Sequence, residues 1–184
     1  MERLIFINRI ILFTYHYRNK PIYNNRQFSK DIKQHLGGTV AVAVYNANTN
    51  TSWSYHGEQR VPIMSTFKAL VCSNLLHQAD TKRVNLNQSI MIKQSDILSY
   101  APITANRVGT SMTLAQLCNT TMLTSDNTTA NLILTNICGP QSVTQFISTL
   151  NDKTPRIDRI EPEVNNVSGA ELRDPPYRHE FYFI

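Results

Sequence analysis

The chain has 184 residues, of which 41% are hydrophobic and 17% are charged. This length is enough for one globular domain with its own core and too short for two domains of average size. The formal net charge is +5, but the basic residues are scattered and no basic cluster is interleaved with aromatic residues, which argues against nucleic-acid binding.

Residues 1–26 contain two short apolar patches separated by Asn8 and Arg9. No apolar run in the chain reaches the roughly 18 uninterrupted residues that a membrane span needs. No small-residue cleavage site follows the patches, so this segment would be an atypical export signal. We therefore predict that it lies outside the folded domain.

The next part of the chain predicts one helix and a hairpin. Over 27–36, apolar residues recur four apart, the spacing of one helix face, and two glycines then end the helix. Two strands are predicted at about 39–46 and 51–56, joined by a turn rich in Asn and Thr.

Beyond Pro62 the chain is predicted to be mostly helical, with apolar runs at 66–79, 113–124, 128–138 and 141–150. A helix and two strands followed by a helical block indicate an α+β fold, in which a helical lobe accompanies a small antiparallel sheet. Residues 152–184 show no sustained periodicity, which predicts a long loop and a tail.

The three cysteines, Cys72, Cys118 and Cys138, form no C-x-x-C pair. The five histidines show no i, i+4 pairing either, so each is predicted to be a surface or capping residue. Because neither residue type has the spacing of metal ligands, we expect no metal and no cofactor.

The first candidate for chemistry is Ser65, followed three residues later by Lys68. If Ser65 lies in the first turn of its helix, both side chains share one face and the amine can bond the hydroxyl. A lysine amine can accept a serine proton, and a helix N-terminus favours the negative charge that then develops. Alone, the pattern far more often describes a capping serine and a solvated lysine.

Two further strings have a plain interpretation when each is taken alone. Ser125, Asp126 and Asn127 precede a predicted helix, as an N-cap cluster does. Glu161 is followed by Pro162 and, four residues on, by Asn165, in what reads as a charged loop.

Taken together and in this order, S-x-x-K, S-D-N and E-P-E-x-N resemble the class A serine β-lactamases. The resemblance covers about residues 27–174, which are predicted to form the domain, with 175–184 as a non-matching tail. It implies the serine β-lactamase/D,D-peptidase-like fold.

The resemblance implies a role for each residue of the first two strings. Ser65 would be acylated by a β-lactam carbonyl, with Lys68 keeping its hydroxyl activated, and Ser125 would pass a proton to the departing ring nitrogen. Asn127 would bind the amide of the substrate side chain. Whether Lys68 or Glu161 accepts the proton during acylation stays open.

The third string would supply the hydrolytic half of the reaction. Glu161 and Asn165 would hold and activate the water that hydrolyses the acyl-enzyme. Arg159 and Asp174 match an ion pair that closes the family's loop beneath the site. By the same analogy the Glu161–Pro162 peptide would be cis.

Other positions match the family scaffold. Cys72 and Cys118 fall where many members form a disulfide, the alternative being two buried thiols. Tyr100 matches the aromatic wall of the cleft, although a core or surface tyrosine fits equally well. Cys138 stands where the family commonly has glycine, so a positive φ there would cost of order 1 kcal/mol and leave a free thiol.

The chain departs from the family in one respect. A Lys-Thr-Gly motif is expected downstream of the glutamate loop, and none follows Glu161; the nearest string, at 153–155, precedes it and ends in proline. We therefore expect a domain without its C-terminal strands and helices, with weak or no hydrolysis. The alternatives are an inactive remnant and an acyl trap resembling a D,D-peptidase, although Glu161 with Asn165 argues against a peptidase.

The resemblance also implies partners and location. The partner would be a small-molecule β-lactam, with no nucleic acid and no membrane span, and the chain is expected to be a monomer. A periplasmic or secreted location follows from the family and from the cysteine pair.

Overall fold

The computed structural model describes residues 4–7, 10–13, 25–36, 40–46, 48–56, 63–153 and 155–165. The described residues up to His56 belong to one compact unit, and those from 63 to 165 belong to another. None of the described helices has the length and apolar character needed to cross a membrane. Of the two predicted domain boundaries, residue 26 falls within the described range 25–36 and residue 174 lies outside the described residues; both stay predictions.

The first unit begins with two short strands that the sequence analysis did not predict. β1 (Leu4–Ile7) pairs antiparallel with β2 (Ile10–Phe13), in a register that sets Ile7 opposite Ile10. These strands are the two apolar patches that were considered as an export signal. The helix α1 (Asn25–Leu36) follows and confirms the helix predicted over 27–36.

The predicted hairpin is also present in the first unit. β3 (Val42–Asn46) pairs antiparallel with β4 (Thr51–Tyr55), from Val42 opposite Tyr55 to Asn46 opposite Thr51. Asn50, in the connecting turn, has a φ of 51°, a left-handed conformation that asparagine tolerates well. β3 starts three residues later than predicted.

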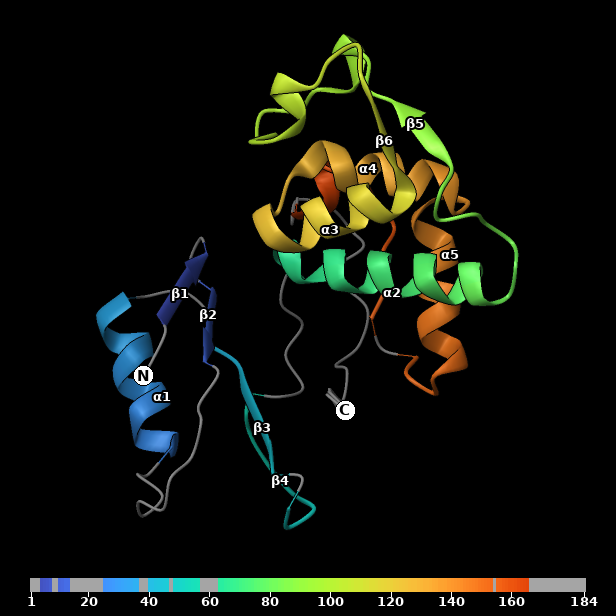
Figure 1. Ribbon diagram of the computed structural model, residues 1–184. Coiled ribbons are helices and arrows are strands. Elements are labelled where there is room, and N and C mark those ends of the chain that lie inside the picture. Colours follow the sequence, from blue (N-terminus) through green and yellow to red (C-terminus); the bar gives the residue numbers. More distant parts are fainter. Residues whose placement is uncertain are drawn as a thin grey trace. The chain divides into compact units, whose positions relative to one another are not determined.

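The second unit is built on four helices, and each predicted helical run is confirmed to within two or three residues. They are α2 (Phe67–Asp80), α3 (Leu114–Thr124), α4 (Asn127–Asn136) and α5 (Gly139–Thr149). Figure 1 shows α2 running beneath α3 and α4, and α2 contacts all three other helices. Together with the small antiparallel sheets, this arrangement confirms the α+β class.

The second unit also contains the third pair of strands of the chain, which was not predicted. β5 (Ser89–Met91) pairs antiparallel with β6 (Ser111–Thr113), which leads directly into α3. Each strand has three residues, too few for a period of two to be visible in the sequence. The 3-10 turns η2 (Gln94–Asp96) and η3 (Thr104–Asn106) lie between them.

The core of the second unit collects apolar side chains from all four helices and from the loop after α5. Its largest fully buried members are Phe67, Val71, Leu75, Ile92, Leu114, Leu117, Ile133, Leu134, Ile137, Val143 and Ile157. The helices satisfy their own backbone hydrogen bonds, so burying these side chains needs few compensating polar contacts. Ile157 ties the loop that carries Glu161 to this core.

The cysteines are resolved into one pair and one free thiol. Cys72 and Cys118 form a disulfide that joins α2 to α3, as the resemblance implied, which excludes the two-thiol alternative. Cys138 is exposed and free. Its φ is 67°, so the positive φ considered for this position is present. A non-glycine residue in that conformation costs about 1 kcal/mol.

Candidate active site

The Lys68 amine is the centre of a polar cluster in the second unit. The side chain is only 3% exposed. Its Nζ lies 2.6 Å from Asn127 Oδ1, 2.7 Å from the Ser125 carbonyl oxygen, 3.1 Å from Ser125 Oγ and 3.4 Å from both Ser65 Oγ and Glu161 Oε1. A buried amine needs such acceptors, because removing it from water without them costs several kcal/mol.

Ser65 lies in the 3-10 turn η1 (Met64–Thr66), which runs directly into α2. The helical run was predicted from residue 66 and α2 begins at Phe67, so Ser65 lies just before the helix and not in its first turn. The spacing of three residues still brings its hydroxyl beside Lys68, at the long end of the hydrogen-bond range. Met64 has a φ of 52°, a rare conformation that often occurs at functional sites.

Ser125 reaches Lys68 from the tight connection between α3 and α4, and Asn127 reaches it from the first residue of α4. Ser125 ends α3 in the left-handed region, with φ of 58°. Asp126 is the N-cap of α4, and its side chain accepts a hydrogen bond from the Thr129 N–H. The N-cap interpretation of this string is therefore right for Asp126 and wrong for Ser125, which caps the preceding helix.

Asp126 also fixes the loop that carries Tyr100, a function that the sequence analysis missed. Its fully buried carboxylate accepts hydrogen bonds from the Ile103 and Thr104 N–H groups and from the Thr104 hydroxyl. The Asn127 N–H donates to the Tyr100 carbonyl at 2.9 Å. Tyr100 itself is 54% exposed, which excludes the core alternative. Its loop is thus attached to the turn that holds Ser125.

Glu161 closes the cluster on the other side of Lys68. Its side chain is 5% exposed, and its backbone is held by one side chain from α4. The Glu161 N–H donates to Asn131 Oδ1 at 3.0 Å, and Asn131 Nδ2 donates to the Glu161 carbonyl at 2.8 Å. The Glu161–Pro162 peptide is cis, as the resemblance implied. Asn131 was not predicted, and its position one turn after Asn127 is the only sequence signal it carries.

The environment shifts the pKa of Lys68 downward. Burial is the largest cause, because it penalises the charged ammonium. The nearby carboxylates of Glu161 and Asp126 oppose the shift by favouring the charged form. The net result is an amine that loses its proton more readily than an ordinary lysine does.

Two of the predicted side chains, those of Asn165 and Asp174, are not described by the structure. Asn165 ends the 3-10 turn η4 (Glu163–Asn165), and its side chain lies outside the described residues. Asp174 is also outside them, so the predicted pair with Arg159 stays a prediction.

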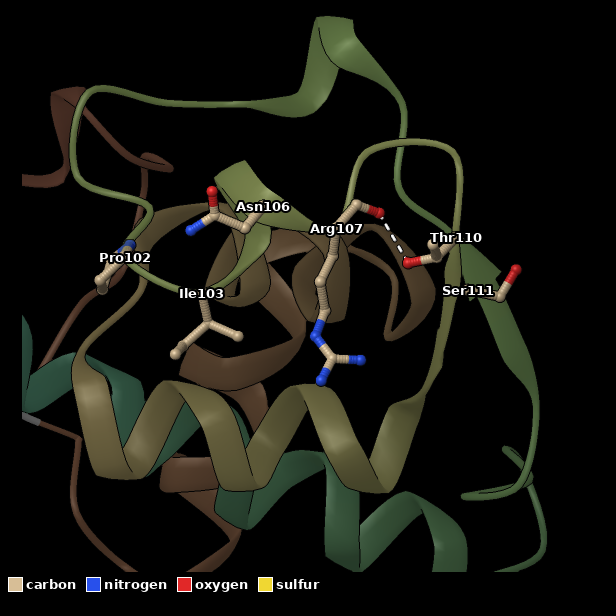
Figure 2. A pocket seen from close by; sticks show the side chains of 6 residues that line it. All are labelled: Pro102, Ile103, Asn106, Arg107, Thr110 and Ser111. Carbon is tan, nitrogen blue, oxygen red and sulfur yellow. Dashed lines mark hydrogen bonds between the residues drawn. The ribbon is translucent and has the colours of Figure 1, made fainter.

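A shallow pocket lies elsewhere on the second unit, around η3 (Figure 2). Its lining residues are Pro102, Ile103, Asn106, Arg107, Thr110 and Ser111. None of these side chains contacts Lys68. Within the described ranges, no group of three or more His, Cys, Asp or Glu side chains is arranged to hold a metal ion. The polar cluster around Lys68 is therefore the candidate site.

Comparison with known proteins decides the family. A family model described as the beta-lactamase enzyme family matches residues 25–180. The chain belongs to this β-lactamase family. Over 145 residues it is 41% identical to the beta-lactamase PSE-4 of Pseudomonas aeruginosa, a match that covers 79% of this chain and 50% of that protein. A beta-lactamase of Rhodobacter capsulatus is 36% identical over 143 residues, with 78% and 49% covered.

Solved β-lactamase structures share the fold of the matched part. The chromosome-encoded beta-lactamase of Vibrio parahaemolyticus aligns with a TM-score of 0.76 and 36% identity, covering 81% of this chain and 57% of that one. An ancestral class A β-lactamase gives 0.75 and 35%, covering 82% and 58%. The predicted class A fold is confirmed. The chain spans about half the length of the curated β-lactamases it matches.

Proposed function

We propose that this chain carries the acylation and deacylation residues of a class A serine β-lactamase, which hydrolyses the β-lactam amide through a serine acyl-enzyme and so gives antibiotic resistance. One observation carries the proposal: the buried Lys68 amine lies 3.4 Å from both the Ser65 hydroxyl and the Glu161 carboxylate. A nucleophile and two possible proton acceptors thus meet in one polar cluster.

In the acylation step, Ser65 Oγ attacks the β-lactam carbonyl carbon and loses its proton to a base. Either the neutral Lys68 amine or Glu161 accepts that proton. The carbon–nitrogen bond of the ring then breaks, and the Ser125 hydroxyl donates a proton to the departing nitrogen. Lys68 Nζ is 3.1 Å from Ser125 Oγ, so it can return a proton to that oxygen.

Deacylation uses the carboxylate on the other side of the amine. Glu161 takes a proton from a water molecule, whose oxygen attacks the acyl carbonyl, and Ser65 Oγ leaves with a proton to restore the enzyme. Asn131 holds the Glu161 backbone at two points, which supports a fixed carboxylate. In this proposal Asn165 holds the same water, while Asn127 and Tyr100 contact the substrate.

Burial of Lys68 supports its role as a base. Because burial lowers its pKa, a larger share of the amine is neutral near pH 7 than for an ordinary lysine. A neutral amine has a lone pair that can accept the Ser65 proton. The short contacts to the Ser125 carbonyl and Asn127 Oδ1 keep that amine in place.

Two features of the chain bear on its rate. The sequence contains no Lys-Thr-Gly string, and the chain spans about half the length of its relatives. In the family this motif would supply binding groups for the substrate carboxylate, and the loss of one oxyanion donor alone costs about 10² to 10³ in rate. We therefore propose that residues 1–184, tested by themselves, turn over slowly or undetectably, and adduct formation is the more sensitive measurement.

The test combines a chromogenic cephalosporin with intact-mass measurement on the purified chain. We expect a covalent adduct on Ser65, with colour release at a low rate. Ser65→Ala should abolish both signals, whereas Ser73→Ala, a change at an exposed serine of α2, should change neither. Glu161→Gln should stop the decay of the adduct; adduct formation at the parent rate in this variant would assign the acylation base to Lys68, and its loss would assign it to Glu161.

Each possible result of this test has a different meaning. A stable adduct on the parent chain would favour the acyl trap over the hydrolase. Neither colour nor adduct would contradict the proposal and favour an inert fragment.

The place of action belongs to the same proposal. The Cys72–Cys118 disulfide supports an oxidising compartment, such as the periplasm or the exterior. We also propose that the chain acts as a monomer. Size-exclusion chromatography with light scattering checks the monomer, and thiol labelling of cell fractions before and after reduction checks the compartment.

A further inference from the structure

The segment that delivers Glu161 to the site has no regular secondary structure between residues 155 and 160. Its backbone donors and acceptors therefore have no partners from a helix or a strand ladder. Two helix side chains supply such partners at two points, four residues apart. Asn131 of α4 bonds Glu161, and Thr144 of α5 bonds Ile157.

The Thr144 hydroxyl serves both polar groups of one backbone residue. The Ile157 N–H donates to Thr144 Oγ1 at 2.9 Å, and the same hydroxyl donates to the Ile157 carbonyl at 3.3 Å. Ile157 is fully buried in the core, so water is not available as a substitute partner. Leaving a buried N–H unsatisfied has a substantial cost, which makes this contact important for the path of the segment.

The two attachments together define the direction of the segment. Asn131 fixes the backbone at Glu161, and Thr144 fixes it four residues earlier at Ile157. With Ile157 also fixed, the peptide that enters Glu161 has a set orientation. That matters at the site because the Glu161 carboxylate lies at 3.4 Å from the Lys68 amine, where a shift of about 1 Å costs much of the rate.

We propose that Thr144, a residue with no contact to the cluster around Lys68, is a positioning residue that holds Glu161 in place by anchoring the backbone of Ile157. The kinetic part of this inference rests on the proposed function, and the structural part does not. The competing explanation is that Thr144 only fills space between α5 and the loop.

Two substitutions separate these explanations. Thr144→Val keeps the shape of the side chain and removes the hydroxyl, whereas Thr144→Ser keeps the hydroxyl and removes a methyl group. Thr149→Val is the matched control, because it makes the same change on the same helix at an exposed residue whose hydroxyl bonds only the Phe146 carbonyl of its own helix.

The first measurement is hydrogen exchange of the Glu161 backbone amide. This measurement does not require the chain to have enzymatic activity. This amide donates to Asn131 and lies four residues from the bond that is removed. We expect Thr144→Val to accelerate its exchange about tenfold, the effect of losing about one net hydrogen bond, and Thr144→Ser to restore protection. Unchanged exchange in Thr144→Val, or acceleration in Thr144→Ser as well, would overturn the inference.

The second measurement separates acylation from deacylation by following the Ser65 adduct by mass. Thr144→Val should lengthen the lifetime of the adduct about tenfold while its rate of formation changes less than twofold. Where Glu161→Gln leaves adduct formation intact, equal slowing of both steps in Thr144→Val would show a general structural effect and contradict the positioning role. If the parent chain forms no adduct, the proposed function fails and the exchange of the Glu161 amide alone decides the inference. Should Thr144→Val fail to fold, Thr144→Ala is measured in its place.

Discussion

The helical unit and the β3–β4 hairpin differ in how they are stabilised. Four helices share one core made of side chains from within residues 63–164, and they satisfy most of their backbone hydrogen bonds locally. In the hairpin, β4 has one buried side chain, Tyr55, and one half-buried side chain, Trp53, while its other side chains are exposed. Two strands alone are marginally stable in water.

This difference explains where the candidate site is found. The five polar groups around Lys68 come from η1, the α3–α4 connection and the loop after α5, all within the helical unit. Because the residues of the site lie at helix ends, the packing of the helical core also holds them in place. Its geometry therefore does not depend on strands that need further neighbours.

The largest predicted effect concerns the disulfide of the helical unit. Replacing Cys72 and Cys118 by alanine should lower the free energy of unfolding by about 4 kcal/mol, because the bond closes a loop of 46 residues. The loss should appear in helical circular dichroism during urea unfolding. A urea midpoint equal to that of the parent chain would contradict the stabilisation assigned to this bond.

A second prediction uses neighbouring leucines of α2. Leu75 is fully buried and Leu76 is 48% exposed. Leu75→Ala should destabilise the helical unit by about 3 kcal/mol through the cavity it leaves, whereas Leu76→Ala should cost about 0.5 kcal/mol or less. Urea unfolding followed by circular dichroism measures both. Similar values for the two variants would mean that the core does not carry the stability assigned to it.

A smaller and opposite effect is expected at the α4–α5 connection. Cys138→Gly should raise the free energy of unfolding by about 1 kcal/mol, because glycine adopts a φ of 67° without strain. Cys138→Ala, which removes the thiol and keeps the strain, is the control and should have little effect. Stabilisation by both variants would assign the gain to the thiol.

The smallest effect is a change in the titration of Lys68. Its pKa is lowered from the ordinary lysine value of 10.5, mainly by burial. Between the lowered value and 10.5 the unfolded chain binds more protons, so this residue makes stability rise with pH in that interval. Glu161→Gln removes a charge that favours the ammonium and should lower the pKa further. NMR titration of the Lys68 side chain measures this, and Glu163→Gln, on the same loop, is the control; a raised pKa in Glu161→Gln would contradict the assignment.

The sequence predicted the helices well, because a period of 3.6 is visible over ten or more residues. It missed β1, β2, β5 and β6, since three or four residues cannot display a period of two and the first pair was interpreted as a possible export segment. The hairpin was found because its turn is rich in Asn and Thr. Local pattern was thus sufficient only for the longer elements.

The candidate site was predicted from the order of three strings, and its supporting residues were not. Asp126, Asn131 and Thr144 act through contacts with backbone 13 to 30 residues away. Such contacts depend on how the helices pack, and the spacing of residues in a single sequence does not predict them. The disulfide was available by resemblance, whereas the left-handed conformation of Ser125 needed the structure.

The shortest backbone contact of the Lys68 amine, 2.7 Å to the carbonyl of Ser125, has a consequence for protein engineering. Every amino acid has that carbonyl, so a replacement at position 125 deletes the hydroxyl without releasing the lysine. Ser125→Ala would therefore remove the hydroxyl that donates the proton and keep the carbonyl that binds Lys68. An evolving sequence could replace this side chain while the backbone contact to the lysine remains.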